Sequence, residues 1–282
     1  MAELTGRALI ASRCAKFFKN GDFVNLGIGV PLMCVNYLPE GVELWLEAEI
    51  GTVGSGPSPS WDDVDIDCID AGGQPASIIP GGSVYDNETS FMFIRGGHID
   101  AAVLGTLQVD QEGSIANWTI PGKLVPGMGG AMDLCAGVKK IIVATDHCEK
   151  NGQSKILKKC TLPLTGYQCV TDIVTERCYF EVTPEGLVLR EVAPGYTVED
   201  ILACTEADVI VPDKVGVHLF SQRPGSFLLC ARHPVLHAEI SSHRISELPP
   251  FRGLPDKINT FLLIGTSLTA ECIRIMMLIK FD

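Results

Sequence analysis

The segment Lys139-Lys140-Ile141-Ile142-Val143-Ala144 is the clearest indication of the fold in this sequence. Two lysines are followed by four consecutive apolar residues, with no polar residue alternating between them. A short run of this kind is typical of a strand that is buried on both faces, as in a parallel sheet covered by helices on each side. We therefore predict an interior parallel strand at this position.

Further short apolar runs on the N-terminal side of this segment extend the same pattern. They predict strands at 23–26, 44–46, 77–79 and 101–104. Residues 3–19 have helical periodicity and end at a Gly21-Asp22 turn. The apolar face of this predicted helix comprises Leu4, Ala8, Ala11, Ala15 and Phe18, and its basic residues, Arg13 among them, lie elsewhere. Strands separated by helical segments predict an α/β fold: an open, mostly parallel sheet with flanking helices.

The composition changes near residue 215. Up to that point 15 Lys/Arg oppose 29 Asp/Glu, whereas residues 216–282 contain 7 Lys/Arg, 5 Asp/Glu and four of the six histidines. Prolines at 249, 250 and 255 interrupt any periodicity in the second stretch. We expect one domain at 1–215 and a divergent C-terminal extension at 216–282 that is peripheral or poorly ordered and unnecessary for catalysis.

Charge, apolar runs and cysteine spacing argue against several classes of protein. The net charge of −12 argues against a nucleic-acid partner, which requires a basic face. No uninterrupted apolar run reaches the ~20 residues of a membrane span, and the N-terminus lacks a signal-peptide pattern. The eleven cysteines include no CxxC pair, and the spacing of His147, Cys148 and Cys160 fits no standard zinc site. We expect a cytoplasmic protein without a bound metal.

Three familiar motifs are absent. Gly27-Ile28-Gly29 follows a predicted strand, as a dinucleotide site would, but the third glycine of that pattern is replaced by Leu32. Pro31 also stands where the phosphate-binding helix would begin. The chain has no GxxxxGK[ST] loop, and Gly54-Ser55-Gly56 lacks the spacing of a GxSxG nucleophile elbow. NAD binding, P-loop chemistry and serine hydrolysis are therefore not supported.

Two other stretches have residues suited to catalysis. Residues 47–51 place Glu49 where a predicted strand enters a glycine turn, and α/β sheets hold reactive groups at the carboxyl ends of their strands. Three glycine-rich segments at 94–100, 116–123 and 127–133 could bring backbone N–H groups close to an oxyanion. Each has a plain alternative, a solvated carboxylate and a set of tight turns, and these observations alone leave both interpretations open.

The three glycine-rich segments are IRGGHID, ANWTIPGK and GMGGAMD. In this order and spacing they resemble the β subunits of class I CoA-transferases, of the acetate/butyrate–acetoacetate type, and the C-terminal half of the fused succinyl-CoA:3-oxoacid enzymes. The resemblance extends through the segments at 25–31, 79–82, 160–166 and 182–187. It covers roughly residues 3–210. It implies an enzyme that transfers CoA between short-chain carboxylic acids.

The resemblance also implies the catalytic residues. The nucleophile of the family is the glutamate of an S-E-N-G motif, which corresponds here to Ala48-Glu49-Ile50-Gly51. Glu49 would carry CoA as a glutamyl thioester, so that CoA is a substrate and covalent intermediate and no cofactor is permanently bound. The backbone N–H of Gly130 would be the oxyanion donor. Further contacts to substrate or CoA are implied for Gly27, Gly29, Asn117, Lys123 and Gly129.

A partner is implied as well, namely an α subunit in an α2β2 or larger hetero-oligomer. Two alternatives stay open. Ile50 replaces the asparagine of the family motif, which favours a non-catalytic homologue that serves in binding or assembly. A 3-oxoadipate-type or glutaconate-type transferase would use the same chemistry on other acids. We expect a structural role for His98, and either ligand contacts or structural ion pairs for Arg95 and Lys123.

Overall fold

The computed structural model describes residue 4, residues 6–123, residue 125 and residues 127–218. These residues belong to one compact unit. The helical elements are α1 (Gly6–Cys14), η1 (Ala15–Phe17), η2 (Pro31–Tyr37), α2 (Asn87–Arg95), α3 (Ala131–Gly137) and α4 (Val198–Ala203). The strands are β1 (Phe23–Leu26), β2 (Trp45–Ala48), β3 (Thr52–Ser55), β4 (Ile78–Val84), β5 (Ala101–Leu104), β6 (Gln108–Asp110), β7 (Ile115–Ala116), β8 (Ile141–Ala144), β9 (Ile156–Leu157), β10 (Val170–Val174), β11 (Cys178–Thr183), β12 (Gly186–Val192), β13 (Val209–Ile210) and β14 (Gly216–Val217). No helix within these described ranges is long and apolar enough to cross a membrane.

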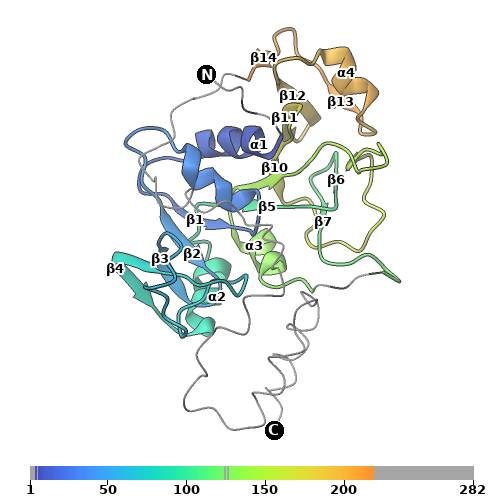
Figure 1. The fold of residues 1–282 in the computed structure, drawn as a ribbon. Helices are drawn as coiled ribbons and strands as arrows, with labels where there is room; N and C mark the ends of the chain where they lie inside the picture. Colours follow the sequence, from blue (N-terminus) through green and yellow to red (C-terminus); the bar gives the residue numbers. More distant parts are fainter. Residues whose placement is uncertain (1–3, 5, 124, 126, 219–282) are drawn as a thin grey trace, which may run out of the picture. The chain divides into compact units, whose positions relative to one another are not determined.

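One large mixed sheet organises the unit (Figure 1). Its order is β13-β12-β11-β10-β8-β5-β1-β2-β3-β4, and β14 pairs with β12 beside this path. The middle of the sheet, from β10 through β8, β5 and β1 to β2, is entirely parallel. Towards each end the pairing becomes antiparallel, in β2-β3-β4 and in β10-β11-β12. The strands β7, β6 and β9 form a separate small sheet.

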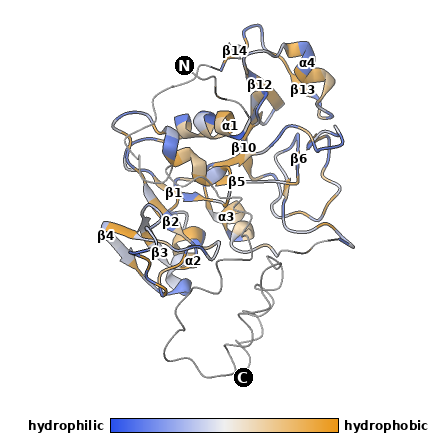
Figure 2. Cartoon of the chain, in the orientation of Figure 1, coloured by the Kyte–Doolittle hydropathy of each residue, from blue (hydrophilic) through white to orange (hydrophobic). Residues whose placement is uncertain are grey.

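The central strands are buried on both faces. In β8, Ile141 and Val143 pack into a core that also includes residues of α2, α3 and α4. Ile142 and Ala144 face the opposite core, together with residues of α1 and η2. Colouring by hydropathy shows the same arrangement, with hydrophobic central strands and mostly hydrophilic connecting segments (Figure 2). The α/β fold with helices on both faces of a mostly parallel sheet is therefore confirmed.

The strands predicted at 23–26, 101–104 and 141–144 are confirmed with their bounds unchanged. Two other strand predictions need correction. The strand predicted at 44–46 lies at Trp45–Ala48, and the buried strand predicted at 77–79 corresponds to the start of β4, which has no buried residue. β4 is half-buried to exposed because it is the end strand of the sheet and pairs only with β3. The antiparallel pairs β2-β3-β4 and β10-β11-β12 are consistent with the prediction of a mostly parallel sheet.

The predicted N-terminal helix is shorter than 3–19 and changes to a 3-10 turn at Ala15. Arg13 is buried, because its guanidinium lies over the rings of Phe17 and Tyr179 and forms two hydrogen bonds to Glu191 of β12, at 2.7 and 2.9 Å. A charged side chain is tolerated at such a depth when it is paired. The burial of Arg13 could not be predicted from helical periodicity, because its partner lies 178 residues away in the sequence.

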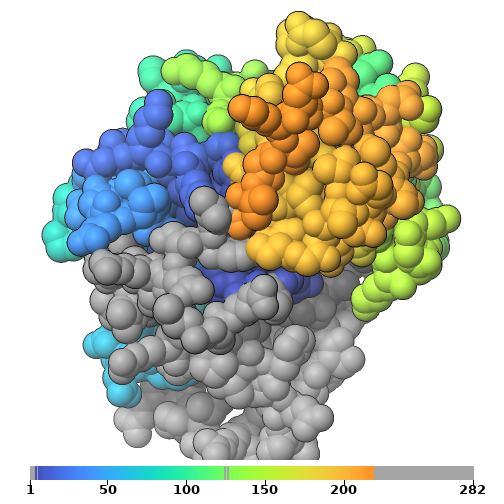
Figure 3. All heavy atoms as spheres, turned by 90° about the horizontal axis from the view of Figure 1, so that it is seen from above, coloured from blue at the N-terminus to red at the C-terminus, as the bar shows by residue number. Residues whose placement is uncertain are grey.

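Residues 216–218 continue the same compact unit beyond the predicted boundary at 215. Gly216 and Val217 form β14, and the Nδ1 atom of the buried His218 lies 3.2 Å from Glu191 Oε2. In Figure 3 the last described residues, in orange, lie directly against the yellow surface of the preceding segment. The remainder of the predicted extension, 219–282, lies outside the described residues.

Candidate active site

Glu49 is the first residue after β2, in a turn that only glycine completes. The N–H of Gly51 donates to the carbonyl oxygen of Ala48 at 2.9 Å, and the N–H of Tyr85 donates to the carbonyl oxygen of Gly51 at 2.9 Å. Gly51 has φ +117°, and a Cβ at this position would collide with the carbonyl oxygen of Tyr85. A side chain at position 51 would therefore displace the turn that presents Glu49.

Gly130 meets the Glu49 carboxylate directly. Its backbone N–H donates to Glu49 Oε1 at 3.2 Å, joining residues 81 positions apart in the sequence. A Cβ at Gly130 would lie 2.6 Å from Glu49 Oε2, and one at Gly129 would lie 3.3 Å from Glu49 Oε1. Glycine at these two positions allows the backbone to approach the carboxylate. The arrangement can stabilise negative charge on an oxygen bound to the Glu49 carboxyl carbon.

The helices α2 and α3 hold this pair in place. Asn87, in the first turn of α2, donates its Nδ2 hydrogen to the carbonyl oxygen of Glu49 at 3.0 Å. Gly130 caps the N-terminus of α3. Arg95 of α2 forms an ion pair with Asp133 of α3 at 2.7 Å, and α3 also packs against the end of α2 at Gly137, where a Cβ would collide with a carbonyl oxygen. Arg95 thus forms a structural ion pair, which is one of the two roles expected for it from the sequence.

A buried polar cluster lies behind Glu49. The Glu47 carboxylate accepts hydrogen bonds from Asn25 Nδ2 and from Ser90 Oγ, both at 2.7 Å. Burial raises the pKa of Glu47, and burial together with the Glu47 charge raises the pKa of Tyr85 to about 12. Glu47 was not predicted as a site residue, although it stands in the same motif as Glu49. The burial of this carboxylate depends on the positions of Asn25 and Ser90, which the sequence does not show.

Four of the residues assigned to substrate or CoA have no hydrogen bond or ion pair to Glu49 in the described part of the chain: Gly27, Gly29, Asn117 and Lys123. The Asn117 side chain donates to the carbonyl oxygen of Gly105 at 3.0 Å and accepts from Thr165 Oγ1 at 2.6 Å. Gly27 allows β1 to approach β5, since a Cβ would lie 3.1 Å from a carbonyl oxygen there. Gly29 and Lys123 are exposed in turns.

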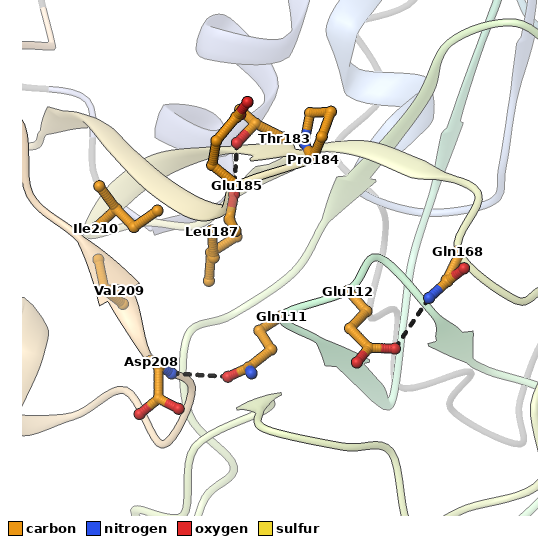
Figure 4. Close-up of a pocket in the computed structure, with 11 residues that line it drawn as sticks. Gln111, Glu112, Gln168, Thr183, Pro184, Glu185, Leu187, Asp208, Val209 and Ile210 are labelled. Atoms are coloured by element: carbon orange, nitrogen blue, oxygen red, sulfur yellow. Dashed lines mark hydrogen bonds between the residues drawn. The ribbon is translucent and has the colours of Figure 1, made fainter.

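A pocket of about 630 Å³ lies elsewhere, beside β12 and β13 (Figure 4). Its lining includes the carboxylates of Glu112, Glu185 and Asp208, and it contains none of the predicted site residues. Three hydrogen bonds join residues of its lining: from Gln168 Nε2 to Glu112 at 3.0 Å, from the backbone N–H of Asp208 to Gln111 at 2.9 Å, and from Thr183 Oγ1 to the carbonyl oxygen of Gly186 at 2.9 Å. The Glu49–Gly130 pair is therefore separate from this pocket.

The histidine and cysteine residues that would suggest a metal have other partners. The ring nitrogens of the fully buried His147 lie 3.1 and 3.0 Å from the hydroxyls of Thr175 and Thr205. Burial lowers the pKa of His147 to about 4. Among the described residues, no group of three or more His, Cys, Asp or Glu side chains is arranged to hold a metal ion. The N–H of His98 closes a turn onto the carbonyl oxygen of Phe93 at 3.1 Å.

The chain belongs to the coenzyme A transferase family. Residues 7–203 match the family model described as "Coenzyme A transferase". Within the family it is a β-type chain of class I. It is 50% identical over 220 residues to the beta chain of the acetate CoA-transferase of Haemophilus influenzae, and the match covers 78% of this chain and 98% of that protein. The corresponding chain of a probable succinyl-CoA:3-ketoacid coenzyme A transferase of Bacillus subtilis is 43% identical over 209 residues, 74% of this chain and 97% of that protein.

Solved structures share the fold at lower identity. An acyl-CoA transferase from Escherichia coli O157:H7 superposes with a TM-score of 0.61 at 23% identity and covers 77% of this chain and 44% of that one. The glutaconate coenzyme A-transferase of Acidaminococcus fermentans gives a TM-score of 0.58 at 19% identity, covering 79% of this chain and 91% of that one. These likenesses support the fold, and the resemblance found in the sequence is confirmed at the level of the family.

Proposed function

We propose that this chain is the catalytic β subunit of an enzyme that transfers CoA between short-chain carboxylic acids, with Glu49 as the nucleophile. The observation that carries the proposal is the 3.2 Å hydrogen bond from the Gly130 N–H to Glu49 Oε1, formed at the end of a strand in a turn that requires glycine. The names of the similar β-type chains, which refer to acetate and to a 3-ketoacid, support this substrate class.

The proposed reaction has two halves. A Glu49 carboxylate oxygen attacks the acyl-CoA thioester, the C–S bond breaks, and a mixed anhydride and free CoA thiolate form. The thiolate then attacks the Glu49 carboxyl carbon, the first acid leaves as its carboxylate, and a glutamyl-CoA thioester remains. A second carboxylate reverses these steps and leaves as the new acyl-CoA, which predicts ping-pong kinetics.

Gly130 would act at the tetrahedral intermediates. Each attack on a carbonyl carbon places negative charge on an oxygen, and a single backbone donor at that oxygen contributes about 2.7–4 kcal/mol. Glu49 attacks as the ionised carboxylate, so the steps require neither a general base nor a permanently bound cofactor. Lys123 is exposed and has no carboxylate partner within the described residues, which leaves its ammonium available to a CoA phosphate.

The proposal includes an α subunit, in an α2β2 or larger complex in the cytoplasm. It rests on the names of the similar chains, which mark each as one of the subunits of its enzyme. The isolated chain should have negligible transferase activity, and the α chain should restore it. Full activity of the chain alone would exclude this part of the proposal.

The test of the nucleophile uses the α–β complex and acetoacetyl-CoA. Mass analysis should find a CoA adduct on the peptide that contains Glu49, and Glu49→Gln should abolish both the adduct and turnover. Glu43→Gln provides a control, because Glu43 is an exposed carboxylate before the same strand. An adduct on another residue, or near-normal turnover in Glu49→Gln, would refute the proposal.

One observation favours a non-catalytic homologue. Ile50, beside Glu49, is 38% exposed and stands where the family motif has asparagine. On this alternative the complex binds acyl-CoA and forms no adduct. If an adduct does form, a competition among acetate, butyrate, succinate, 3-oxoadipate and glutaconate as acceptors identifies the preferred acid.

A further inference from the structure

Glu47 is an unusual residue for the interior of a sheet. Its side chain is 3% exposed, and within the described residues no Lys, Arg or His lies at ion-pair distance from it. A buried carboxylate without a cation is costly unless its oxygens accept hydrogen bonds. Here both oxygens do, from Asn25 Nδ2 and from Ser90 Oγ at 2.7 Å each.

The two donors come from different elements. Asn25 is the cross-strand partner of Glu47 in the parallel pair β1-β2, and Ser90 is a fully buried residue of α2. One carboxylate thus connects the end of β2 to a neighbouring strand and to a helix. An ionised carboxylate is suited to this because it accepts from both donors at once. A neutral side chain of the same shape would have to reverse one of the bonds.

The cluster is connected to the backbone that precedes the nucleophile. Ser90 Oγ lies 3.4 Å from the carbonyl oxygen of Ala48, which offers its hydroxyl hydrogen a second acceptor. The groups that face Glu47 from the surrounding elements are Asn25, Ser90, the phenol of Tyr85 and the carboxylate of Glu49. When Glu47 is neutral, the Ser90 hydroxyl can donate to the carbonyl oxygen of Ala48 instead. This change of acceptor would displace the peptide next to Glu49.

We propose that ionised Glu47 is a positioning residue for the nucleophile, holding the end of β2 between β1 and α2 so that the Glu49 carboxylate meets the Gly130 amide. This inference rests on the proposed role of Glu49 and adds to it. A displacement of the reacting group by about 1 Å can lower a rate about 100-fold. Loss of the Glu47 charge should therefore slow the chemical step while substrate binding is little changed.

The test compares Glu47→Gln with wild type in the α–β complex. Formation of the CoA adduct on Glu49 in a single turnover should be about 10- to 100-fold slower in the variant, with the KM for acyl-CoA within about twofold and a melting temperature within a few degrees. The pH dependence provides a second readout. The wild-type rate should include a fall on acidification that is due to proton uptake by Glu47, and Glu47→Gln should lack that part and keep only the fall that the need for an ionised nucleophile imposes. Glu43→Gln, a charge change outside the cluster, should behave as wild type.

The outcomes separate this inference from the proposed function. An adduct on Glu49 that forms at the wild-type rate in Glu47→Gln would overturn the positioning role and leave the nucleophile intact. An adduct absent from Glu49 in wild type would overturn both. If Glu47→Gln does not fold, Ser90→Ala replaces it, since that variant removes one donor and keeps the carboxylate. A slowed adduct rate with unchanged KM supports the inference there, and an unchanged rate refutes it.

Discussion

Gly130→Ala tests the geometry of the candidate site with the smallest change available. A Cβ at this position would lie 2.6 Å from Glu49 Oε2, whereas ordinary contacts begin at 3.4 Å, so the carboxylate must retreat by about 0.8 Å. That movement breaks the hydrogen bond from the Gly130 N–H. Loss of one oxyanion donor lowers kcat about 10²- to 10³-fold, which corresponds to about 2.7–4 kcal/mol. We expect a loss in this range.

The fold should tolerate the substitution, because Gly130 has φ −80° and ψ −1°, which alanine adopts without strain. A change of about 1 kcal/mol in unfolding free energy would shift the melting temperature by about 2–4 °C in a domain of this size. Gly105→Ala is the matched control, since a Cβ there meets no atom within 4 Å. The assay is steady-state CoA transfer by the α–β complex with a thermal melt of each variant. A folded Gly130→Ala enzyme within threefold of the wild-type kcat would refute the role of the amide, as would an equal loss in Gly105→Ala.

Three further predictions concern stability. Arg13→Met should destabilise the fold by about 3 kcal/mol in urea unfolding, because the partly buried Glu191 loses the guanidinium that donates to both of its oxygens; an unchanged midpoint would contradict this. Burial keeps His147 neutral in the folded state, with a pKa of about 4, whereas the histidine of the unfolded chain binds its proton near pH 6.5. The free energy of unfolding should therefore decrease as pH falls from about 6.5 to about 4, by at most about 3 kcal/mol. Unfolding free energies measured across this range should lose that slope in His147→Gln, and a slope that persists would exclude His147 as its source. Ending the chain after Val215 removes β14 and its buried histidine contact, so the melting temperature should fall. Ending it after Gln222 should preserve both the melting temperature and CoA transfer. Equal melting temperatures for the two truncated chains would show that β14 does not contribute to stability.

The centre of the sheet could be predicted from the sequence because its strands need no distant information. Residues 141–144 are apolar at every position, and this reports burial on both faces wherever the neighbouring strands lie. The ends of the sheet were harder to predict. Whether 77–79 belongs to an inner or an outer strand depends on how many strands follow it in space, which its own residues do not encode.

The candidate site divides in the same way. Glu49 and the glycines at 129 and 130 could be proposed because the resemblance fixes their places in known motifs, and the structure brings all three together. Glu47 could not be proposed, since an acidic residue in a strand is expected to be exposed until Asn25 and Ser90 are seen around it. Asn117 was predicted to contact the substrate because it lies in one of the family motifs. In the structure the hydrogen bonds of its side chain stabilise a loop.

The contact of Gly137 with Ile94 has a consequence for genetics. At this point the backbones of α3 and α2 touch without an intervening side chain, and the two helices carry the donor and the anchor of the nucleophile turn. Any larger residue at 137 would act as a wedge and part them. A screen for inactive alleles should therefore recover position 137 together with position 49. Substitutions at position 137 would inactivate the enzyme although they lie away from the reacting groups. A map of inactivating substitutions would therefore include the contact between the two helices as well as the residues that touch substrate.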